Sequence, residues 1–182
     1  MNKIILGIIG ENGSGKTALT EYIKQKYNAV SFRFSDPLKD ILDRLYLENN
    51  RQNFQTLSTV LRQNFREDLL SSVIAEDIKK AADPLIIAEG VRRPSDIVYL
   101  KNLPGFHLVN IKADAETRYE RIKNRAEKSG DQSKTWEEFL TEEKQESEQK
   151  IDEIASQADY TIDNNGTPED LHKQLDKIIS IY

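Results

Sequence analysis

Short apolar runs recur along the chain, and the longer segments between them place apolar residues at helical spacing. The runs hardly alternate with polar residues, which is typical of strands that are buried on both faces of a parallel sheet. The longer segments have room for the helices that connect parallel strands. The predicted strands cover residues 4–9, 29–34, 85–88, 107–111 and 160–162. This alternation predicts a single three-layer α/β/α domain over residues 1–182.

The final helix carries a clear start signal. Thr167 is a favourable N-cap residue, Pro168 suits the first helical position, and Asp170 completes a near capping box. Leu171 and Leu175 then fall on one helix face. We therefore expect a helix that begins at Pro168.

Residues 136–153 break the pattern because they are strongly acidic. Eight Asp and Glu residues face two lysines there, a local net charge of −6. Apolar residues stand only at the two ends, with Leu140 last in the first group and Ile151 first in the second. Two interpretations follow: a helix solvated along its length, or part of a lid that closes over an active site.

Composition narrows the functional classes. Hydrophobic residues make up 37% and charged residues 31%, as in a globular protein, and no run reaches the ~20 apolar residues of a membrane span. The net charge of −5 argues against a broad nucleic-acid surface. With no cysteine, thiolate metal sites are excluded and a cytoplasmic location is expected. We expect no nucleic-acid or membrane partner, and a monomer or homodimer.

Residues 10–17 read GENGSGKT and match the phosphate-loop pattern G-x-x-x-x-G-K-[ST] at every fixed position. An apolar strand precedes the match and an amphipathic helix follows it, as the pattern requires. The loop turns its backbone N–H groups towards phosphate oxygens, and the helix N-terminus adds a partial positive charge. Lys16 would reach the β and γ phosphates, and the Thr17 hydroxyl would bind Mg²⁺. The predicted ATP contacts are Gly10, Asn12, Gly13, Ser14, Gly15, Lys16 and Thr17.

Other phosphate-loop classes fit the sequence less well. Guanine-selective switches carry an N-K-x-D element and a D-x-x-G element, and neither occurs here in the right place. An AAA module would need a longer chain with an added helical subdomain. ATP with Mg²⁺ is therefore the expected nucleotide.

Three short elements accompany the phosphate loop: SDPLK at residues 35–39, EGVR at 89–92 and ADYTIDNNGTPEDL at 158–171. With these elements the chain resembles the nucleoside monophosphate kinases, and among them the deoxynucleoside monophosphate kinases and dephospho-coenzyme A kinases. The resemblance implies a five-stranded parallel sheet of order 2-3-1-4-5. It also implies acceptor-binding helices at about residues 36–80 and a lid at about 128–149.

The same resemblance implies roles for the acceptor side. Asp36 would contact magnesium-bound water or the acceptor, and Lys39 would contact the acceptor phosphate. Glu89 would hold Mg²⁺ through water, and Arg92 or the adjacent Arg93 would grip the transferring phosphoryl group or the acceptor phosphate. Asp36 before proline is also a good helix N-cap, and both roles are compatible.

An arginine stripe follows the fourth strand at Arg118, Arg121 and Arg125, bordering the apolar face of the predicted helix. Three stacked arginines repel one another unless an anion lies between them. Glu116 and Glu120 are possible local partners. The resemblance instead implies that Arg121 and Arg125 close on ATP.

Two further sets of candidates complete the site. The resemblance places the loop after the last strand against the adenine, so Asn165 and Gly166 are expected there, although Asn-Asn-Gly is also simply a good turn. Arg62 and Arg66 are expected to line the acceptor pocket.

The expected activity is transfer of the γ-phosphoryl group of ATP to a small acceptor, and the expected acceptor is a (deoxy)nucleoside monophosphate. Lys16, Asp36, Arg92 and Arg121 are the expected catalytic residues. Two alternatives stay open: a dephospho-coenzyme A kinase, with Asp36 as the base, and a non-catalytic ATP-sensing module. The acceptor-side basic residues argue against the sensor, because a sensor needs no second phosphate site.

Overall fold

The five predicted strands form one parallel sheet in a computed structural model of the chain, which describes residues 3–125, 132–143 and 146–182, without the side chains of residues 125 and 146–149. The strand order is β2-β3-β1-β4-β5, and every neighbouring pair is parallel, as expected. The predicted strand ends differ from the observed ones by at most one residue. The strands are β1 (Ile4–Ile9), β2 (Val30–Arg33), β3 (Leu85–Glu89), β4 (Phe106–Lys112) and β5 (Tyr160–Asp163).

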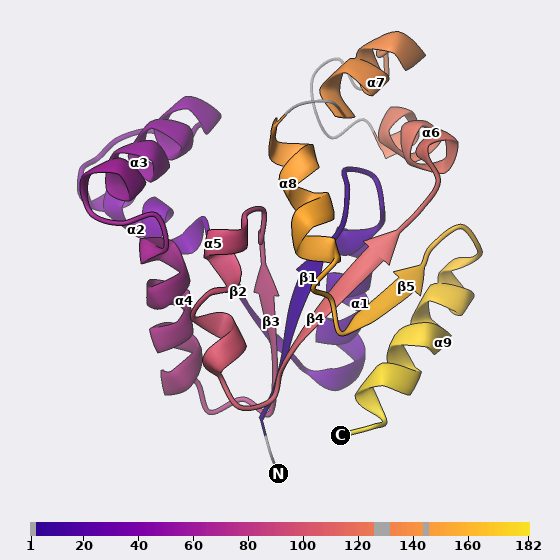
Figure 1. Ribbon diagram of the computed structural model, residues 1–182, viewed down its shortest axis with the longest axis horizontal. Helices are drawn as coiled ribbons and strands as arrows, with labels where there is room; N and C mark the ends of the chain where they lie inside the picture. The colour runs from indigo at the N-terminus through magenta and orange to yellow at the C-terminus, as the bar shows by residue number, and fades with distance from the viewer. Residues whose placement is uncertain (1–2, 126–131, 144–145) are drawn as a thin grey trace.

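Helices connect the strands and cover both faces of the sheet (Figure 1). The segment expected to cover the acceptor falls into three helices, and the acidic segment contains two. The helices are α1 (Lys16–Tyr27), α2 (Asp36–Arg44), α3 (Arg51–Asn64), α4 (Leu69–Lys80), α5 (Pro94–Ile97), the 3₁₀ turn η1 (Leu100–Asn102), α6 (Ala115–Arg125), α7 (Trp136–Glu143), α8 (Glu146–Ala155) and α9 (Pro168–Ile179).

Two apolar cores lie on opposite faces of the sheet. On one face Ile5 and Ile86 pack with Ile74 of α4 and Ile154 of α8. The opposite face packs α1 and α9 against alternate residues of the same strands. The buried members of that second core include Leu6, Ile8, Leu19, Ile23, Ile87, Val109, Leu171 and Leu175. Burial on both faces explains why the strands are continuous apolar runs.

Helix start signals decide two boundaries. At α9 the Thr167 hydroxyl accepts from the Asp170 N–H at 3.2 Å, and the Asp170 carboxylate faces back to Thr167, so the predicted capping box is confirmed. At α2 the N-cap is Ser35, so Asp36 is the first helical residue and not the cap. Its carboxylate instead accepts from the Arg33 N–H at 2.8 Å.

All strands point their carboxyl ends towards the same edge of the sheet (Figure 1). At this edge α2 and α3 stand on one side, whereas α6 and α7 stand on the other. Ligands of open parallel sheets bind at this edge, so the candidate site lies between these helices. Within the described part of the chain, no helix is long and apolar enough to cross a bilayer.

Candidate functional site

The phosphate loop joins the end of β1 to the start of α1. Gly13 has φ +81°, and a Cβ atom there would lie 2.7 Å from the Arg118 backbone oxygen. Gly15 has φ +106°, and a Cβ atom there would collide with the Asn164 side-chain amide. Any side chain at either position would be strained and would displace neighbouring elements. The glycines therefore let the loop pack against α6 and the loop after β5.

The Lys16 side chain folds back onto the phosphate loop. Its Nζ donates to the backbone oxygens of Gly10 and Glu11, both at 2.7 Å. The exposed Thr17 follows it in the first turn of α1. The Ser14 hydroxyl is buried and has no hydrogen-bond partner in the described residues. A buried hydroxyl without a partner is costly, so a phosphate oxygen at this loop would satisfy it.

Asn164, which follows β5, links the phosphate loop to the ends of β4 and β5. Its side chain is 5% exposed, and Nδ2 donates to the Ser14 backbone oxygen at 2.7 Å. The Asn164 N–H in turn donates to Lys112 at the end of β4. The neighbouring Asn165 uses Oδ1 to accept from the Asp114 N–H at 2.8 Å and stays exposed, and Gly166 lies in the exposed turn that follows.

Arg118 is a buried cation between α6, α7 and the phosphate loop. Its guanidinium contacts the Glu143 carboxylate through both Nη atoms, at 2.6 and 2.5 Å. It also lies 3.1 Å from Glu11 Oε1 and 3.4 Å from the Asn12 backbone oxygen. The residues between Leu140 and Ile151 include no apolar side chain for a core, but the Glu143 carboxylate ties the end of α7 to the loop.

Arg121 lies one helical turn beyond Arg118 in α6, and its hydrogen bonding differs from that of Arg118. Its Nη1 atom is buried and has no hydrogen-bond partner in the part of the chain that the structure describes. A buried guanidinium N–H without a partner is expensive, and an anion would satisfy it. Arg125 ends α6, but its side chain lies outside the described residues.

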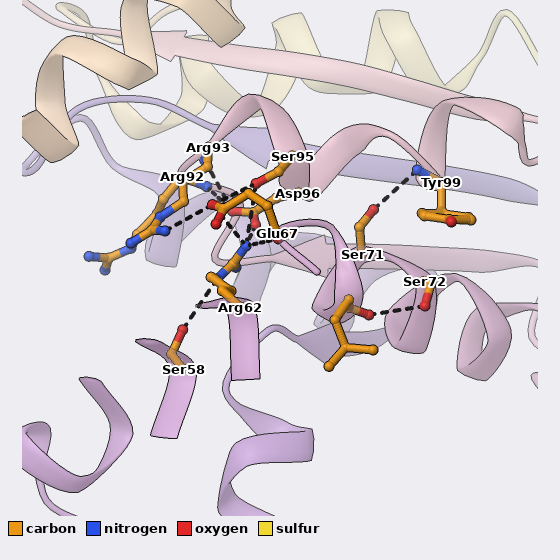
Figure 2. Close-up of polar contacts among 11 residues, drawn as sticks. Ser58, Arg62, Glu67, Ser71, Ser72, Arg92, Arg93, Ser95, Asp96 and Tyr99 are labelled. Atoms are coloured by element: carbon orange, nitrogen blue, oxygen red, sulfur yellow. Dashed lines mark hydrogen bonds and ion pairs between the residues drawn. The ribbon is translucent and has the colours of Figure 1, made fainter. Parts of the chain in front are cut away.

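Arg92 and Arg93 follow β3 on the opposite side of the site (Figure 2). The Arg93 Nη1 atom donates to Glu67 Oε1 at 3.1 Å, whereas the exposed Arg92 side chain has no such partner among the described residues. The backbone N–H groups of both arginines donate to Asp96 Oδ2, at 2.9 and 3.0 Å. Arg92 is therefore the one of the two whose guanidinium is available to a ligand.

Arg62 is buried and does not face solvent. Its Nη2 atom donates to Asp96 Oδ1 at 2.8 Å, and Nη1 donates to the Glu67 backbone oxygen. The structure thus places Arg62 in an internal network beside the Arg92 loop. Arg66 is exposed and pairs with Asp68.

Glu89 ends β3 between two cations. Arg33 Nε lies 3.1 Å from Oε2, and Lys24 Nζ lies 3.3 Å from Oε1. The Lys24 contact is close enough for an ion pair, yet Oε1 has no well-directed hydrogen bond. We regard it as a charge contact only, which leaves Oε1 able to accept from a water.

Asp36 and Lys39 lie at the start of α2 and are exposed. Lys39 Nζ pairs with Asp43 Oδ2 at 2.6 Å, and this hydrogen bond raises the pKa of Lys39. Arg33 links the two acidic candidates, because its N–H binds Asp36 and its side chain binds Glu89. Its place two residues before SDPLK is the only hint that the sequence offers.

The groups at the sheet edge fit a nucleotide phosphate. The Ser14 hydroxyl and the Arg121 Nη1 atom offer donors that other described residues do not satisfy. For Mg²⁺ the fit is weaker: Thr17 presents a hydroxyl, and Glu89 is suited to hold a metal-bound water. Among the described residues no cluster of three His, Asp or Glu side chains forms a metal site.

The sequence model of a family described as an AAA domain matches residues 9–140, more than half of the chain. Proteins named UPF0200 protein are similar over nearly the whole length. The one from Methanococcus maripaludis strain C6 is 26% identical over 183 residues, covering 97% of this chain and 98% of the relative. The one from Methanocaldococcus jannaschii is 28% identical over 180 residues, covering 97% and 89%.

Solved structures share the fold at low sequence identity. Shikimate kinase from Bacteroides thetaiotaomicron superposes with a TM-score of 0.63 at 12% identity and covers 97% of this chain and 98% of its own. Shikimate kinase from Aquifex aeolicus gives 0.57 at 15% identity, with coverage of 97% and 96%. The fold is therefore that of a P-loop kinase, as the resemblance implied.

Proposed function

The chain belongs to the AAA domain family, and on this premise we propose that it is an ATP-dependent kinase for a small acceptor. Membership corrects the expectation that chain length excludes an AAA module. One observation supports the proposal above others. The phosphate loop contains the buried Ser14 hydroxyl and contacts Arg118 of α6, and one helical turn further along α6 the Arg121 Nη1 atom is buried and without a partner in the described residues. An ATP phosphate would satisfy both groups.

Each candidate residue has a role in this proposal. Lys16, now bound to loop carbonyls, would turn to the β and γ phosphates, and Arg121 with Arg125 would neutralise charge from the other side. Thr17 would bind Mg²⁺ directly and Glu89 through water, and the metal would supply positive charge against the phosphates. Catalysis is then positioning and charge neutralisation.

The acceptor side supports a phosphorylated or otherwise anionic acceptor. The exposed Arg92 lies at the end of β3, and Lys39 stands at the start of α2. A (deoxy)nucleoside monophosphate fits this charge, with residues 36–80 covering it. Residues 128–149 would act as the lid, although 128–131 and 144–145 lie outside the described residues. Arg93 is held by Glu67, and Arg62 is held by Asp96, so both act indirectly in this proposal. Asn165 and Gly166 would lie against the adenine. The absence of cysteine fits a cytoplasmic enzyme.

Dephospho-coenzyme A is the second acceptor that we keep, because its hydroxyl needs a base and Asp36 is exposed. The Asp36 carboxylate already accepts from the Arg33 N–H at 2.8 Å, which orients it at the start of α2. The likeness to shikimate kinases is one of fold alone and does not select shikimate.

Acceptor-dependent ADP formation tests the proposal. ATP, Mg²⁺ and the protein are incubated with each member of a panel of nucleoside monophosphates and with dephospho-coenzyme A. We expect one acceptor to raise ADP formation well above the rate with ATP alone. ATP binding without stimulation by any of them would favour the ATP-sensing module.

A further inference from the structure

Arg62 and Asp96 form a buried ion pair directly beneath the loop that carries Arg92 (Figure 2). Arg62 Nη2 and Asp96 Oδ1 are 2.8 Å apart, and the two side chains are 6% and 3% exposed. Arg62 belongs to α3, whereas Asp96 belongs to α5, which follows β3. The pair therefore joins the helices beside the acceptor to the end of the central sheet.

The second oxygen of Asp96 holds the loop itself. Asp96 Oδ2 accepts from the backbone N–H of Arg92 at 2.9 Å and from that of Arg93 at 3.0 Å. Both bonds fix the backbone and leave the Arg92 side chain exposed. A single carboxylate thus fixes the backbone from which the Arg92 side chain leaves the loop.

Arg62 commits four of its five N–H groups to this network and its side chain is 6% exposed, so it is poorly placed to bind an acceptor phosphate. Its Nη1 atom donates to the Glu67 backbone oxygen at 2.5 Å and to Ser95 Oγ at 3.3 Å. Its Nε atom donates weakly to Ser58 Oγ at 3.4 Å. The planar guanidinium is therefore held by α3 itself, by the turn between α3 and α4, and by α5.

We propose that Arg62 and Asp96 are positioning residues that couple α3 to Arg92 and so aim the Arg92 guanidinium at the acceptor site. The inference rests on the proposed function, in which Arg92 contacts the transferring phosphoryl group. It replaces the expectation that Arg62 binds the acceptor. The exposed Glu67–Arg93 pair plays no comparable part, since its side chains are 58% and 42% exposed and such pairs constrain little.

A double-mutant cycle separates positioning from plain stabilisation. Arg62→Met is made in the wild type and in Arg92→Ala, and kcat and KM are measured with ATP and the best acceptor of the panel. We expect Arg62→Met to lower kcat about tenfold in the wild type and by no more than about twofold when Arg92 is absent. Glu67→Gln is the control: it weakens only the contacts of the exposed Glu67 carboxylate, including those of Oε1 with Arg93 at 3.1 Å and with Arg62 at 3.6 Å, and should leave kcat within about twofold. Equal effects of Arg62→Met in both backgrounds would overturn the inference.

Amide hydrogen exchange provides a readout that does not depend on activity. The Arg92 and Arg93 amides should exchange faster in Arg62→Met, while amides of β1 and β4 stay protected. Arg62→Lys, which keeps the charge but only a single donor nitrogen, should restore part of both the protection and kcat. If Arg62→Met does not fold, Asp96→Asn takes its place, and its exchange rates and kcat are compared with the wild type in the same way. Unchanged protection of both loop amides would contradict the coupling.

The two failures are distinguishable. A wild-type protein that transfers no phosphoryl group to any acceptor overturns the proposed function and the catalytic part of this inference together. An active wild type with additive effects overturns the coupling alone.

Discussion

Replacing Asn164 by leucine should loosen the phosphate loop without disturbing the sheet. The side chain is 5% exposed and donates from Nδ2 to the Ser14 backbone oxygen at 2.7 Å. Leucine has a similar volume and no donor, and Ser14 is fully buried, so its carbonyl would lose its partner. Leaving such a group unsatisfied costs about 1–3 kcal/mol.

For a chain of this length each kcal/mol lowers Tm by about 2–4 °C, so the loss predicts a fall of about 2–12 °C. Asn164 also packs against Gly15, where any Cβ atom would meet it, so the loop N–H groups should be less well aimed. We expect ATP affinity to fall about tenfold, which corresponds to about 1.4 kcal/mol.

Thermal unfolding and titration calorimetry with Mg·ATP measure both effects. Asn165→Leu is the matched control for stability, because it also removes one hydrogen bond, to the Asp114 N–H, but at an exposed position. Its effect should stay within about 0.5 kcal/mol. If both variants unfold at the same temperature as the wild type and Asn164→Leu binds ATP equally well, the loop does not depend on Asn164.

Three further predictions concern other parts of the chain. Arg92→Ala should impair phosphoryl transfer more than ATP binding. Arg93→Ala should impair transfer less, because Glu67 already holds the Arg93 side chain. Equal small effects of the two variants in steady-state kinetics would show that neither arginine acts in the reaction. Residues 128–149 should exchange amide hydrogens faster in the free protein than with a bisubstrate inhibitor, and equal protection would show a rigid segment. Burial raises the pKa of Asp176, but bonds from Lys26, Tyr27 and Tyr22 outweigh it and lower the pKa below 3.8. The stabilisation by Asp176 is therefore present above pH 3.8 and is lost as the pH falls through the lower pKa of the folded state. In urea unfolding, the difference in free energy of unfolding between the wild type and Asp176→Asn should shrink in acid. A difference that does not change with pH would refute this.

The fold could be predicted because its signals are local. Each strand is an uninterrupted apolar run, and the capping box at Thr167 is read from residues three positions apart. The strand order came from the resemblance and not from periodicity, since no apolar pattern says which strand lies beside β1. The predicted N-cap of α2 was wrong by one residue: Ser35 is the N-cap, and the Asp36 carboxylate instead accepts from the Arg33 N–H.

The site was less predictable because its contacts join distant segments. The phosphate loop is a local motif, yet its support comes from Asn164 and Arg118, far along the chain. Glu143 lies in an acidic run where nothing marks it out from its neighbours, and only the fold brings it to Arg118. Asp96 likewise gives no signal of its own, since its three partners come from two segments.

Following the γ-phosphorus of ATP tests the proposed transfer of a phosphoryl group to an acceptor. The protein is incubated with Mg²⁺, ATP labelled at that position and the acceptor panel, and the products are separated. The account predicts label on one acceptor, transferred at least ~100-fold more slowly by folded Lys16→Ala, which lacks the charge aimed at the transferring group. Label found only in ATP or inorganic phosphate, or equal transfer by Lys16→Ala, would contradict it.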